Sequence, residues 1–220
     1  MDISAIMKLL HSGKVKDVYE YDKHKLLFYF SDRISAFDVI FNQDIPGKGK
    51  VLCRFAKFWF DFLDTPHHMI KIIDQDKMLV EKLDMVPLEF VVRGFFYGSL
   101  IDRFQKESFS YDLPSNFIPT MAAKLPKPIL DTTTKSDNHD VPINKQQIVS
   151  SNILSNEDYN NLKFRSIDIY NKMFNFLKTK GFILADIKFE YGINRNGEIL
   201  LADSIGPDEY RLWKAEHYSP

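Results

Sequence analysis

Charged residues alternate with apolar ones in a segment near the C-terminus, 185–193 (ADIKFEYGI). Because successive side chains of a strand point to opposite faces, Asp186, Lys188 and Glu190 share one face and the apolar residues share the other. Two carboxylates with a lysine between them suit the binding of a cation or the transfer of a phosphoryl group.

The following residues predict a hairpin that supplies another carboxylate. Asn196-Gly197 is a strong signal for a two-residue turn, which would pair Arg195 with Glu198. The same register places Glu190 opposite Asp203. Like charges directly across a ladder destabilise it, so a bound cation or a ligand amine would explain the pair. Mg²⁺ fits because it takes one or two carboxylates together with waters and phosphate oxygens.

Three alternatives stay open for this hairpin. Its carboxylates can lie on a solvated polar face, or Lys188 can neutralise them without a metal ion. A bulge at Gly192 would shift the register by one residue and separate the pair.

Arginine is scarce, since only 7 of the 29 basic residues are Arg. Arginine is suited to bidentate recognition of phosphate, so its positions are informative. Arg93 ends a buried-looking run, EFVV, and Ser99 begins a short predicted helix, which together could bind an anion. Arg211 lies in the segment PDEYRLW. The alternatives are an arginine that caps carbonyls, an ordinary N-cap serine, and packing of Arg211 on Trp213.

Lys14 and Lys16 in the segment GKVK are predicted to share one face of the first strand, beside Gly13. A phosphate could bind there, although two lysines on an exposed strand are usually only solvated. Neither a Walker loop nor a Gly-x-Gly-x-x-Gly motif occurs. His67, His68 and His139 are expected to be surface residues, because no HExxH spacing is present.

The elements that position these residues follow from hydrophobic periodicity. Residues 13–31 predict two strands with a turn at 22–25, and strands are also expected at 69–73, 78–83 and 89–96. Residues 48–63 predict a helix, with Val51, Phe55, Phe58, Trp59 and Phe62 on one face and most of its aromatic side chains in the core.

The second half of the chain predicts a long loop, a helix and the hairpin. Residues 110–150 hold five prolines and little periodicity, which indicates a loop region. Ser155 to Asp158 has capping-box spacing and begins a helix that ends at Gly181. We expect an α+β protein with two lobes, a β-rich one at 1–85 and a mixed α/β one at 86–220.

Composition limits the function classes. The chain has 220 residues, of which 45% are apolar and 27% charged, as in ordered globular proteins. A net charge of −1 gives no overall attraction to nucleic acid. Cys53 is the only cysteine, which excludes an intramolecular disulfide and a cysteine zinc site. No apolar run is long enough for a membrane span, so we expect a cytoplasmic protein without membrane or nucleic-acid partners.

Nearly the whole chain resembles the SAICAR synthetase family of purine biosynthesis (phosphoribosylaminoimidazole-succinocarboxamide synthases). Seven segments carry the resemblance in matching order and spacing: GKVKDVYE (13–20), SDRISAFDV (31–39), IPGKGKVL (45–52), EKLDMVPLEFVVRGFFYGSL (81–100), TTKSDNHD (133–140), ADIKFEYG (185–192) and ADSIGPDEYRLW (202–213).

The resemblance implies a two-lobed fold similar to protein kinases and ATP-grasp enzymes, with an ATP-binding N-terminal lobe and substrate and metal sites in the C-terminal lobe. It implies that ATP drives amide formation between L-aspartate and 5-aminoimidazole-4-carboxylate ribonucleotide (CAIR). The CAIR carboxylate attacks the γ-phosphate, and the amine of aspartate then attacks the acyl phosphate. Catalysis of this kind depends on positioning and charge neutralisation.

The resemblance also assigns residues to ATP and its metal ion. Lys14 would hold ATP phosphates, and the backbone from Glu81 to Leu83 would meet adenine. Glu190 and Asp203 would bind Mg²⁺. Lys188 would neutralise the migrating phosphoryl group, with Asp186 in a supporting role.

The other substrates are assigned in the same way. Arg93, Ser99 and Arg211 would cradle the 5′-phosphate of CAIR. Ser35 and Asp38, in a loop, would contact its aminoimidazole part, and the loop from Lys135 to Asp140 would contact aspartate or the imidazole carboxylate. The question of homo-oligomers stays open.

The chain departs from the family pattern at Ser204 and at Glu209-Tyr210, and its sequence ends at Pro220, where relatives usually continue into a helical segment. Two other functions stay open. The alternating segment DIKFE also suits a small-molecule kinase, which would accumulate a stable phosphorylated product without an amine acceptor. The departures at Ser204 and Glu209-Tyr210 leave open a non-catalytic module, which would bind nucleotide without turnover.

Overall fold

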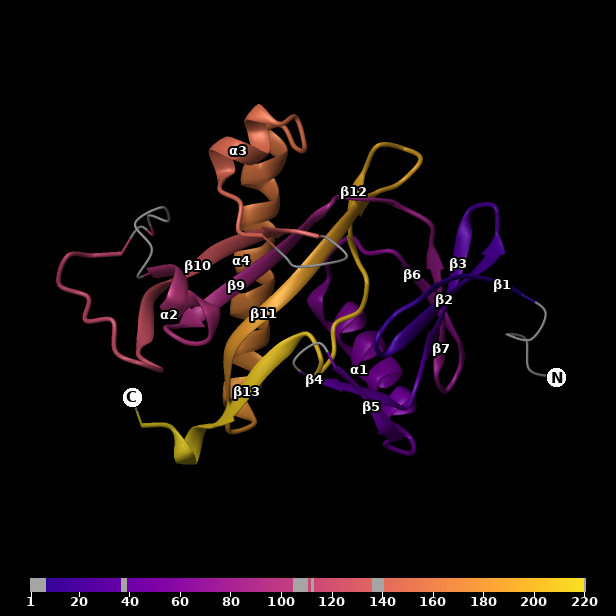
Figure 1. The fold of residues 1–220 in the computed structure, drawn as a ribbon, viewed down its shortest axis with the longest axis horizontal. Coiled ribbons are helices and arrows are strands. Elements are labelled where there is room, and N and C mark those ends of the chain that lie inside the picture. The colour runs from indigo at the N-terminus through magenta and orange to yellow at the C-terminus, as the bar shows by residue number, and fades with distance from the viewer. Residues whose placement is uncertain (1–6, 37–38, 105–110, 112, 136–140, 220) are drawn as a thin grey trace. The chain divides into compact units, whose positions relative to one another are not determined.

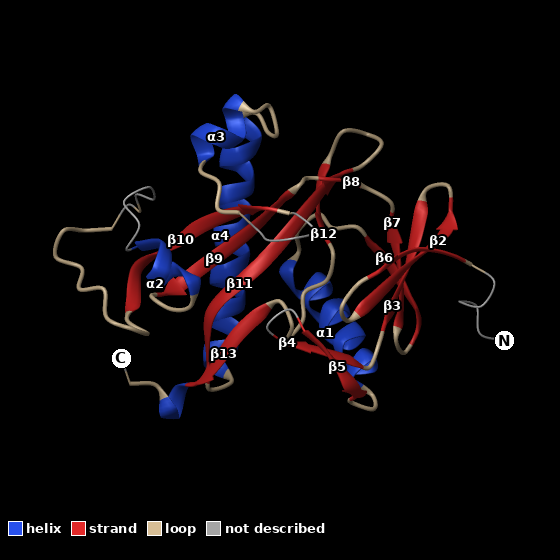
Figure 2. Ribbon diagram, in the orientation of Figure 1, coloured by secondary structure: helices blue, strands red, loops and turns tan. Residues whose placement is uncertain are grey.

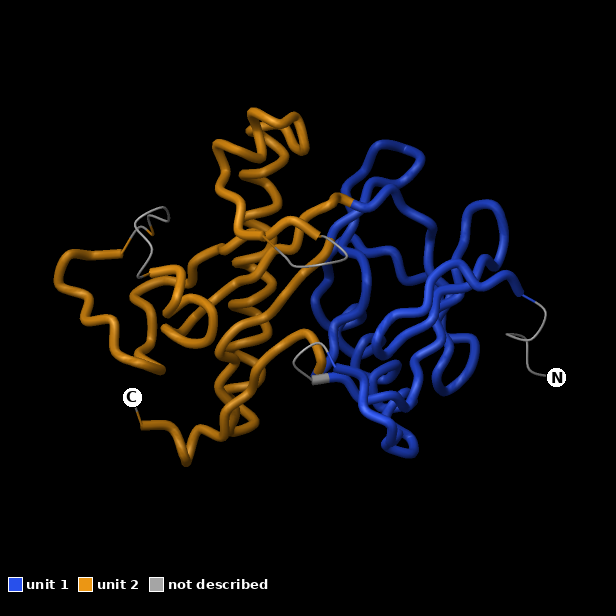
Figure 3. Tube along the Cα trace, viewed as in Figure 1, with its two compact units in different colours: residues 1–85, 191–207 blue, residues 86–190, 208–220 orange. Residues whose placement is uncertain are grey.

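The computed structural model describes residues 7–36, 39–104, 111, 113–135 and 141–219 (Figure 1). Helices and strands are mixed along the chain, which confirms the α+β prediction (Figure 2). The chain forms two compact units, residues 1–85 with 191–207 and residues 86–190 with 208–220 (Figure 3). Residues 191–207, which the sequence analysis placed in the second lobe, thus belong to the first unit.

An antiparallel sheet with the strand order β1-β2-β3-β7-β6 forms the main part of the first unit. Its core contains Leu27, Met78 and Val80, each fully buried. The turn after Asp22 was predicted, and the Asp22 carboxylate accepts a hydrogen bond from the backbone N–H of His24. The strands are β1 (Lys8–Ser12), β2 (Lys16–Asp22), β3 (Lys25–Phe30), β6 (Met69–Asp74) and β7 (Lys77–Glu81).

The turn between β1 and β2 corrects the expectation for the two lysines. The backbone N–H of Gly13 donates to the carbonyl of Lys16 at 2.8 Å, so the chain turns here. Lys14 therefore lies in the turn and Lys16 begins β2, and the two do not share a strand face. Strand β1 was not predicted from the sequence, because its residues are all exposed and show no alternation of buried and exposed positions.

Helix α1 (Lys48–Leu63) has the predicted bounds, but its buried face was predicted wrongly. Val51, Phe55, Phe58 and Phe62 are exposed. Apolar residues surround most of this helix, so two stripes with helical spacing compete and periodicity alone does not choose between them. The face that is buried consists of Gly49, Leu52, Cys53, Ala56, Trp59, Phe60 and Leu63.

Two short strands, β4 (Arg33–Ala36) and β5 (Val39–Asp44), precede this helix in the chain and pair with each other. Ser35 was expected in a loop but lies in β4, opposite Ile40. Strand β8 (Asp84–Met85) pairs with the last residues of β11.

The second unit is built on β9 (Leu88–Phe95), which pairs with β10 (Lys124–Thr134) and with β11 (Phe182–Ile193). Strand β13 (Tyr210–Lys214) pairs with β11 and leads into a short 3-10 turn, Ala215–His217. Helix α4 (Asn156–Thr179) packs against this sheet through the predicted face, which includes Leu162, Ile169 and Met173. Ser155 caps it as expected, since its Oγ accepts from the Asp158 N–H.

The predicted loop at 110–150 is partly wrong, because it contains β10 and helix α3 (Lys145–Ser150). Pro126 and Pro128 lie within β10, at a register shift between Lys124 and Ile129. Proline cannot donate to a ladder and is confined to edge strands and bulges. Strand β10 is the edge strand of the order β10-β9-β11-β12, which is why it tolerates the prolines that led us to expect a loop.

The hairpin from β11 to β12 (Ile199–Ala202) differs from its predicted register. The N–H of Asn194 donates to the carbonyl of Glu198, and the N–H of Gly197 donates to Asn194. Gly197 has a φ of +83°, so the loop has three residues and ends in a glycine bulge. Arg195 does not pair with Glu198, and the register argument that placed Glu190 opposite Asp203 is therefore wrong.

Candidate active site

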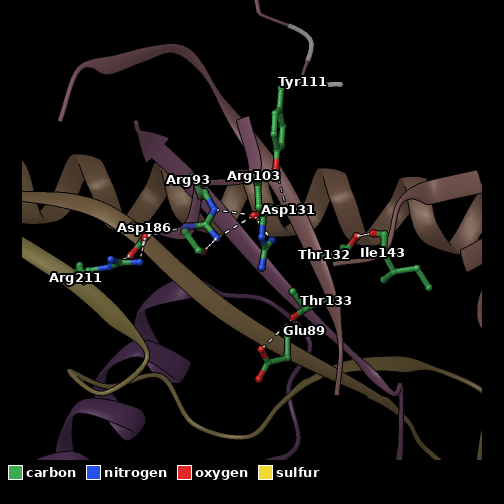
Figure 4. Close-up of polar contacts among 11 residues, drawn as sticks. Glu89, Arg93, Arg103, Tyr111, Asp131, Thr132, Thr133, Ile143, Asp186 and Arg211 are labelled. Carbon is green, nitrogen blue, oxygen red and sulfur yellow. Dashed lines mark hydrogen bonds and ion pairs between the residues drawn. The ribbon is translucent and has the colours of Figure 1, made fainter. Parts of the chain in front are cut away.

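Arg93 is the centre of a buried polar cluster in the second unit (Figure 4). It lies near the end of β9, and its side chain is only 3% exposed. Its Nε donates to Asp131 Oδ2 at 2.9 Å and an Nη donates to Ser99 Oγ at 2.9 Å. The other Nη lies 3.4 Å from Asp186. The predicted pair Arg93 and Ser99 thus meets, with Ser99 as the first residue of α2 (Ser99–Phe104).

Arg211 joins this cluster from β13. Its Nε donates to Asp186 Oδ1 at 2.8 Å, and an Nη lies 2.6 Å from Oδ2, which makes the pair bidentate. The guanidinium also lies over the ring of Tyr97, rather than on Trp213 as the alternative proposed. Gly98 makes room for it, because a Cβ there would lie 2.5 Å from an Arg211 Nη. Asp186 therefore links the two arginines that the sequence analysis had assigned to one anion.

A hollow of about 310 Å³ opens beside this cluster. Its lining brings together five of the predicted site residues, namely Arg93, Ser99, Asp186, Lys188 and Arg211. Acidic side chains also line it, so its charges are mixed rather than uniformly positive. The other lining residues are Glu89, Val91, Arg103, Thr133, Ile187, Asp208, Glu209 and Tyr210.

Lysines pair with the carboxylates on the polar face of β11. Lys188 Nζ lies 2.9 Å from Glu89 Oε1 and 3.3 Å from Glu190 Oε1. Lys135 Nζ lies 2.5 Å from the other oxygen of Glu190, whose side chain is 4% exposed. The opposite face, with Ile187 among its residues, is buried, as the alternation predicted. Glu190 is therefore a nearly buried carboxylate that is paired with two lysine ammonium groups.

Asp203 in the first unit is held from two sides. Its carboxylate pairs with Lys16 Nζ, and its backbone carbonyl lies 2.8 Å from His68 Nε2. Asp203 has a φ of +58°, an uncommon conformation for a residue with a side chain. Burial lowers the pKa of His68 to about 4, and its contact with Asp203 opposes this only in part. The expectation that His68 is a surface residue is wrong, since it is 3% exposed.

Arg33 holds the turn that contains Lys14. Arg33 Nη2 donates to the carbonyl of Gly13 at 2.9 Å and to Asp17 Oδ1 at 2.7 Å. Its Nε lies 3.4 Å from the carbonyl of Lys14. This turn therefore has a fixed backbone.

The predicted adenine segment begins where β7 ends. Glu81 donates its N–H to the carbonyl of His68 at 2.8 Å. Leu83 lies against Gly192, since a Cβ on that glycine would be 2.7 Å from the Leu83 Cβ. The predicted residues Asp38 and Asp140 lie outside the described residues.

Asp131 and Arg103, which join Arg93, were not predicted from the sequence. Lys16 was expected to contact a phosphate and His68 to be a surface residue, but both contact Asp203. Arg103 could have been found, because it is one of the seven arginines and lies four residues after Ser99. Asp131 lies in a segment expected to be a loop, so no sequence signal marked it as buried.

The resemblance assigns Glu190 and Asp203 to Mg²⁺, and both residues present a carboxylate. Mg²⁺ takes carboxylates and completes its coordination with water and phosphate oxygens, and Glu190 and Asp203 each present a carboxylate already paired with ammonium groups. Among the described residues, no group of three or more His, Cys, Asp and Glu side chains is placed to hold a metal ion. No helix in the part of the chain that the structure describes is long and apolar enough to cross a membrane.

Comparisons with known proteins agree with the resemblance. The family model described as SAICAR synthetase matches residues 9–219. The phosphoribosylaminoimidazole-succinocarboxamide synthase of Nitrosopumilus maritimus is 53% identical over 212 residues, which cover 96% of this chain and 76% of that protein. A SAICAR synthase from Saccharomyces cerevisiae solved with SAICAR has a TM-score of 0.87 at 30% identity and covers 100% of this chain and 80% of its own. A SAICAR synthetase solved with ADP has a TM-score of 0.82 at 32% identity, covering 94% and 84%.

Proposed function

Because this chain belongs to the SAICAR synthetase family, we propose that its described clusters divide between them the binding of the three substrates of the family's reaction. The chain is an ATP-dependent ligase that joins L-aspartate to CAIR and forms SAICAR, ADP and phosphate in purine biosynthesis. The assignment of individual residues to ATP, Mg²⁺, CAIR and aspartate is the proposal.

The chemistry requires that a carboxylate be activated. A carboxylate is a poor acyl donor until one of its oxygens becomes part of a leaving group. Attack of the CAIR carboxylate oxygen on the γ-phosphorus of ATP forms the acyl phosphate and releases ADP. The amine of aspartate then attacks the carbonyl carbon, phosphate leaves, and the nitrogen loses a proton. Such a sequence needs positioned reactants and neutralised phosphate charge.

The hollow beside Arg93 would bind the 5′-phosphate of CAIR, and this arrangement is the observation that carries the proposal. Arg93, Ser99 and Arg211 meet there although they come from different elements. Guanidinium groups are suited to bidentate contact with phosphate oxygens. Asp186 would keep both arginines in place, which agrees with its predicted supporting role.

Lys188 would neutralise the phosphoryl group as it moves from ATP to the carboxylate. It lies on the same strand face as Asp186, and it lines the same hollow as the proposed cradle. Its ammonium already lies within 3.3 Å of Glu190 and 2.9 Å of Glu89. An ammonium group has three N–H donors, so Lys188 could contact these carboxylates and also donate to a phosphate oxygen.

Four segments of the chain would bind ATP and its metal ion. Lys14, in its fixed turn, would contact the phosphates, and the backbone from Glu81 to Leu83 would contact adenine. Glu190 and Asp203 would hold Mg²⁺, which supplies charge neutralisation at the phosphates when bound. Residues 1–85 would bind mainly the nucleotide, and residues 86–190 and 208–220 would bind mainly the other substrates.

The remaining assignments concern aspartate and the imidazole. Lys135 and Asp140 would contact aspartate or the imidazole carboxylate, and Ser35 and Asp38 would contact the aminoimidazole. The contact of Lys135 with Glu190 supports a position near the carboxylates of β11. Assembly into a homo-oligomer is compatible with the family and is best tested by light scattering.

Product analysis tests the proposed function. The purified chain with ATP, Mg²⁺, CAIR and aspartate should form SAICAR, ADP and phosphate in equal amounts, and omission of aspartate should abolish SAICAR. A folded protein that forms no SAICAR with all substrates present would contradict the function. A stable phosphorylated product without aspartate would favour a kinase instead.

Glu190→Gln and Asp203→Asn test the metal assignment. Both variants should lose ATP turnover by about 100-fold or more, and their urea unfolding should show that they remain folded. Asp102→Asn, which removes an exposed carboxylate of α2, is the matched control. If both variants unfold, so that the loss of activity follows the loss of stability, these carboxylates have a structural role.

A further inference from the structure

Asp131 is a buried carboxylate that none of the assignments above uses. It lies in β10, opposite Val91 of β9, and its side chain is 3% exposed. Its Oδ2 accepts from Arg93 Nε at 2.9 Å and from Arg103 Nη1 at 2.5 Å. The hydroxyl of Tyr111 lies 3.4 Å from its Oδ1 (Figure 4). One carboxylate thus joins two guanidinium groups from different elements.

Arg103 faces the same hollow as the proposed phosphate cradle. It comes from the last turn of α2, its side chain is 13% exposed, and it lines the hollow together with Arg93 and Arg211. Asp131 does not line this hollow. Its charge therefore reaches a ligand there only through the two guanidinium groups that it holds.

The physical role of this carboxylate follows from its partners. Two guanidinium groups that share a small buried volume repel each other, and the repulsion is stronger away from water. A carboxylate between them offsets this repulsion and fixes the rotamers of both side chains. Each guanidinium has five N–H donors, so it can hold Asp131 and still donate to a phosphate oxygen.

We propose that Arg103 is a further phosphate-binding residue of the CAIR site, and that Asp131 is the positioning residue that fixes Arg93 and Arg103 toward the hollow. This inference rests on the proposed position of the CAIR phosphate. It predicts a site in which three arginines contact the phosphate and two carboxylates, Asp131 and Asp186, fix them in place.

Steady-state kinetics of Arg103→Gln and Asp131→Asn test the inference. In both variants the KM for CAIR should rise about tenfold, which corresponds to about 1.4 kcal/mol. The kcat and the KM values for ATP and aspartate should stay within about twofold of the original, because a lost ground-state contact raises KM alone. The matched controls are Arg54→Gln, an exposed arginine of α1, and Asp102→Asn, the exposed neighbour of Arg103.

The double variant adds a readout that a general loss of stability would not give. Because Asp131 acts through Arg103 and Arg93, Arg103→Gln with Asp131→Asn should raise the KM for CAIR by less than the product of the single effects. An unchanged KM for CAIR in Arg103→Gln, or equal rises in KM for all three substrates, would overturn the inference.

If Asp131→Asn does not fold, a direct measurement of CAIR binding to Arg103→Gln still tests the inference. Titration calorimetry of Arg103→Gln should show about tenfold weaker binding of CAIR, with unchanged binding of ADP and of the CAIR nucleoside that lacks the 5′-phosphate. Equal weakening for nucleoside and nucleotide would place Arg103 away from the phosphate. A wild-type chain that binds CAIR through Arg103 but makes no SAICAR would contradict the proposed function and leave this inference standing.

Discussion

Gly98→Ala should displace Arg211 and so weaken the binding of CAIR. Gly98 has a φ of +62°, and a Cβ at this position would lie 2.5 Å from one Arg211 Nη and 2.8 Å from the other. The guanidinium is the end of a flexible side chain, so it can move away. Movement would break its two contacts with the Asp186 carboxylate.

The loss of stability has two parts. An alanine in the left-handed region costs about 1–2 kcal/mol. The Arg211 side chain is 45% exposed, so its ion pair with Asp186 contributes about 1 kcal/mol or less. We therefore expect Gly98→Ala to lower the free energy of unfolding by about 1–3 kcal/mol.

Gly197→Ala separates the two parts. Gly197 has a φ of +83°, and a Cβ there meets no atom within 4 Å. This control variant has only the conformational cost, so urea unfolding should show Gly98→Ala to be less stable than Gly197→Ala by up to about 1 kcal/mol. The KM for CAIR should rise about tenfold in Gly98→Ala and stay unchanged in Gly197→Ala.

A double variant with Arg211→Ala completes the cycle. Once the guanidinium is gone, Gly98→Ala should cost no more than Gly197→Ala and should raise the KM for CAIR no further. If Gly98→Ala and Gly197→Ala lose equal stability and both keep the original KM, the contact between Gly98 and Arg211 and its role in binding CAIR are refuted.

Three further predictions concern stability and the burial of a thiol. Ser155→Ala should lower the free energy of unfolding by about 1 kcal/mol in urea, because it removes the N-cap of α4; no change would contradict the cap. Burial alone would raise the pKa of Asp17, but hydrogen bonds from Arg33 and Ser12 hold it below its usual value of 3.8. The ionised Asp17 carboxylate therefore stabilises the fold fully above pH 3.8, and this stabilisation is lost as the pH falls through the lower folded-state pKa. The difference in free energy of unfolding between the wild type and Asp17→Asn should therefore become smaller below pH 3.8. A difference that does not change with pH would refute the pairing. Burial raises the pKa of the Cys53 thiol to about 12, so a thiol reagent at neutral pH should label it only after unfolding; rapid labelling of the folded protein would show that it is accessible.

The sequence predicted those elements whose signals are local. The bounds of α1, the cap at Ser155 and the turn after Asp22 follow from periodicity, capping and turn chemistry within a few residues. The alternation in β11 placed its charged residues on one face, and the structure brings Asp186 and Lys188 to one hollow. Resemblance to a family supplied the function, which no single motif carried.

Features that depend on contacts with distant parts of the chain could not be predicted from such local signals. The buried face of α1 depends on which of two apolar stripes meets the sheet, and the core contains the stripe with Cys53 rather than the one with Phe55. The prolines of β10 are tolerated because that strand lies at a sheet edge. The hairpin register depended on one glycine, since Gly197 forms a bulge and not the second residue of a two-residue turn.

Asp131 and His68 show the same limit for the site. Each is a polar residue whose role comes from partners far along the chain, Arg93 for Asp131 and Asp203 for His68. Their local sequence suggested a loop and a surface turn. Long-range burial of a polar group has no local signal, so only the fold reveals it.

The central claim is that the CAIR carboxylate is activated as an acyl phosphate on this chain. CAIR labelled with ¹⁸O in its carboxylate tests this claim directly, by mass spectrometry of the phosphate released with SAICAR. One carboxylate oxygen becomes the bridging oxygen and leaves with the phosphate, so the account predicts one ¹⁸O atom in each phosphate formed. Unlabelled phosphate released together with SAICAR would contradict it.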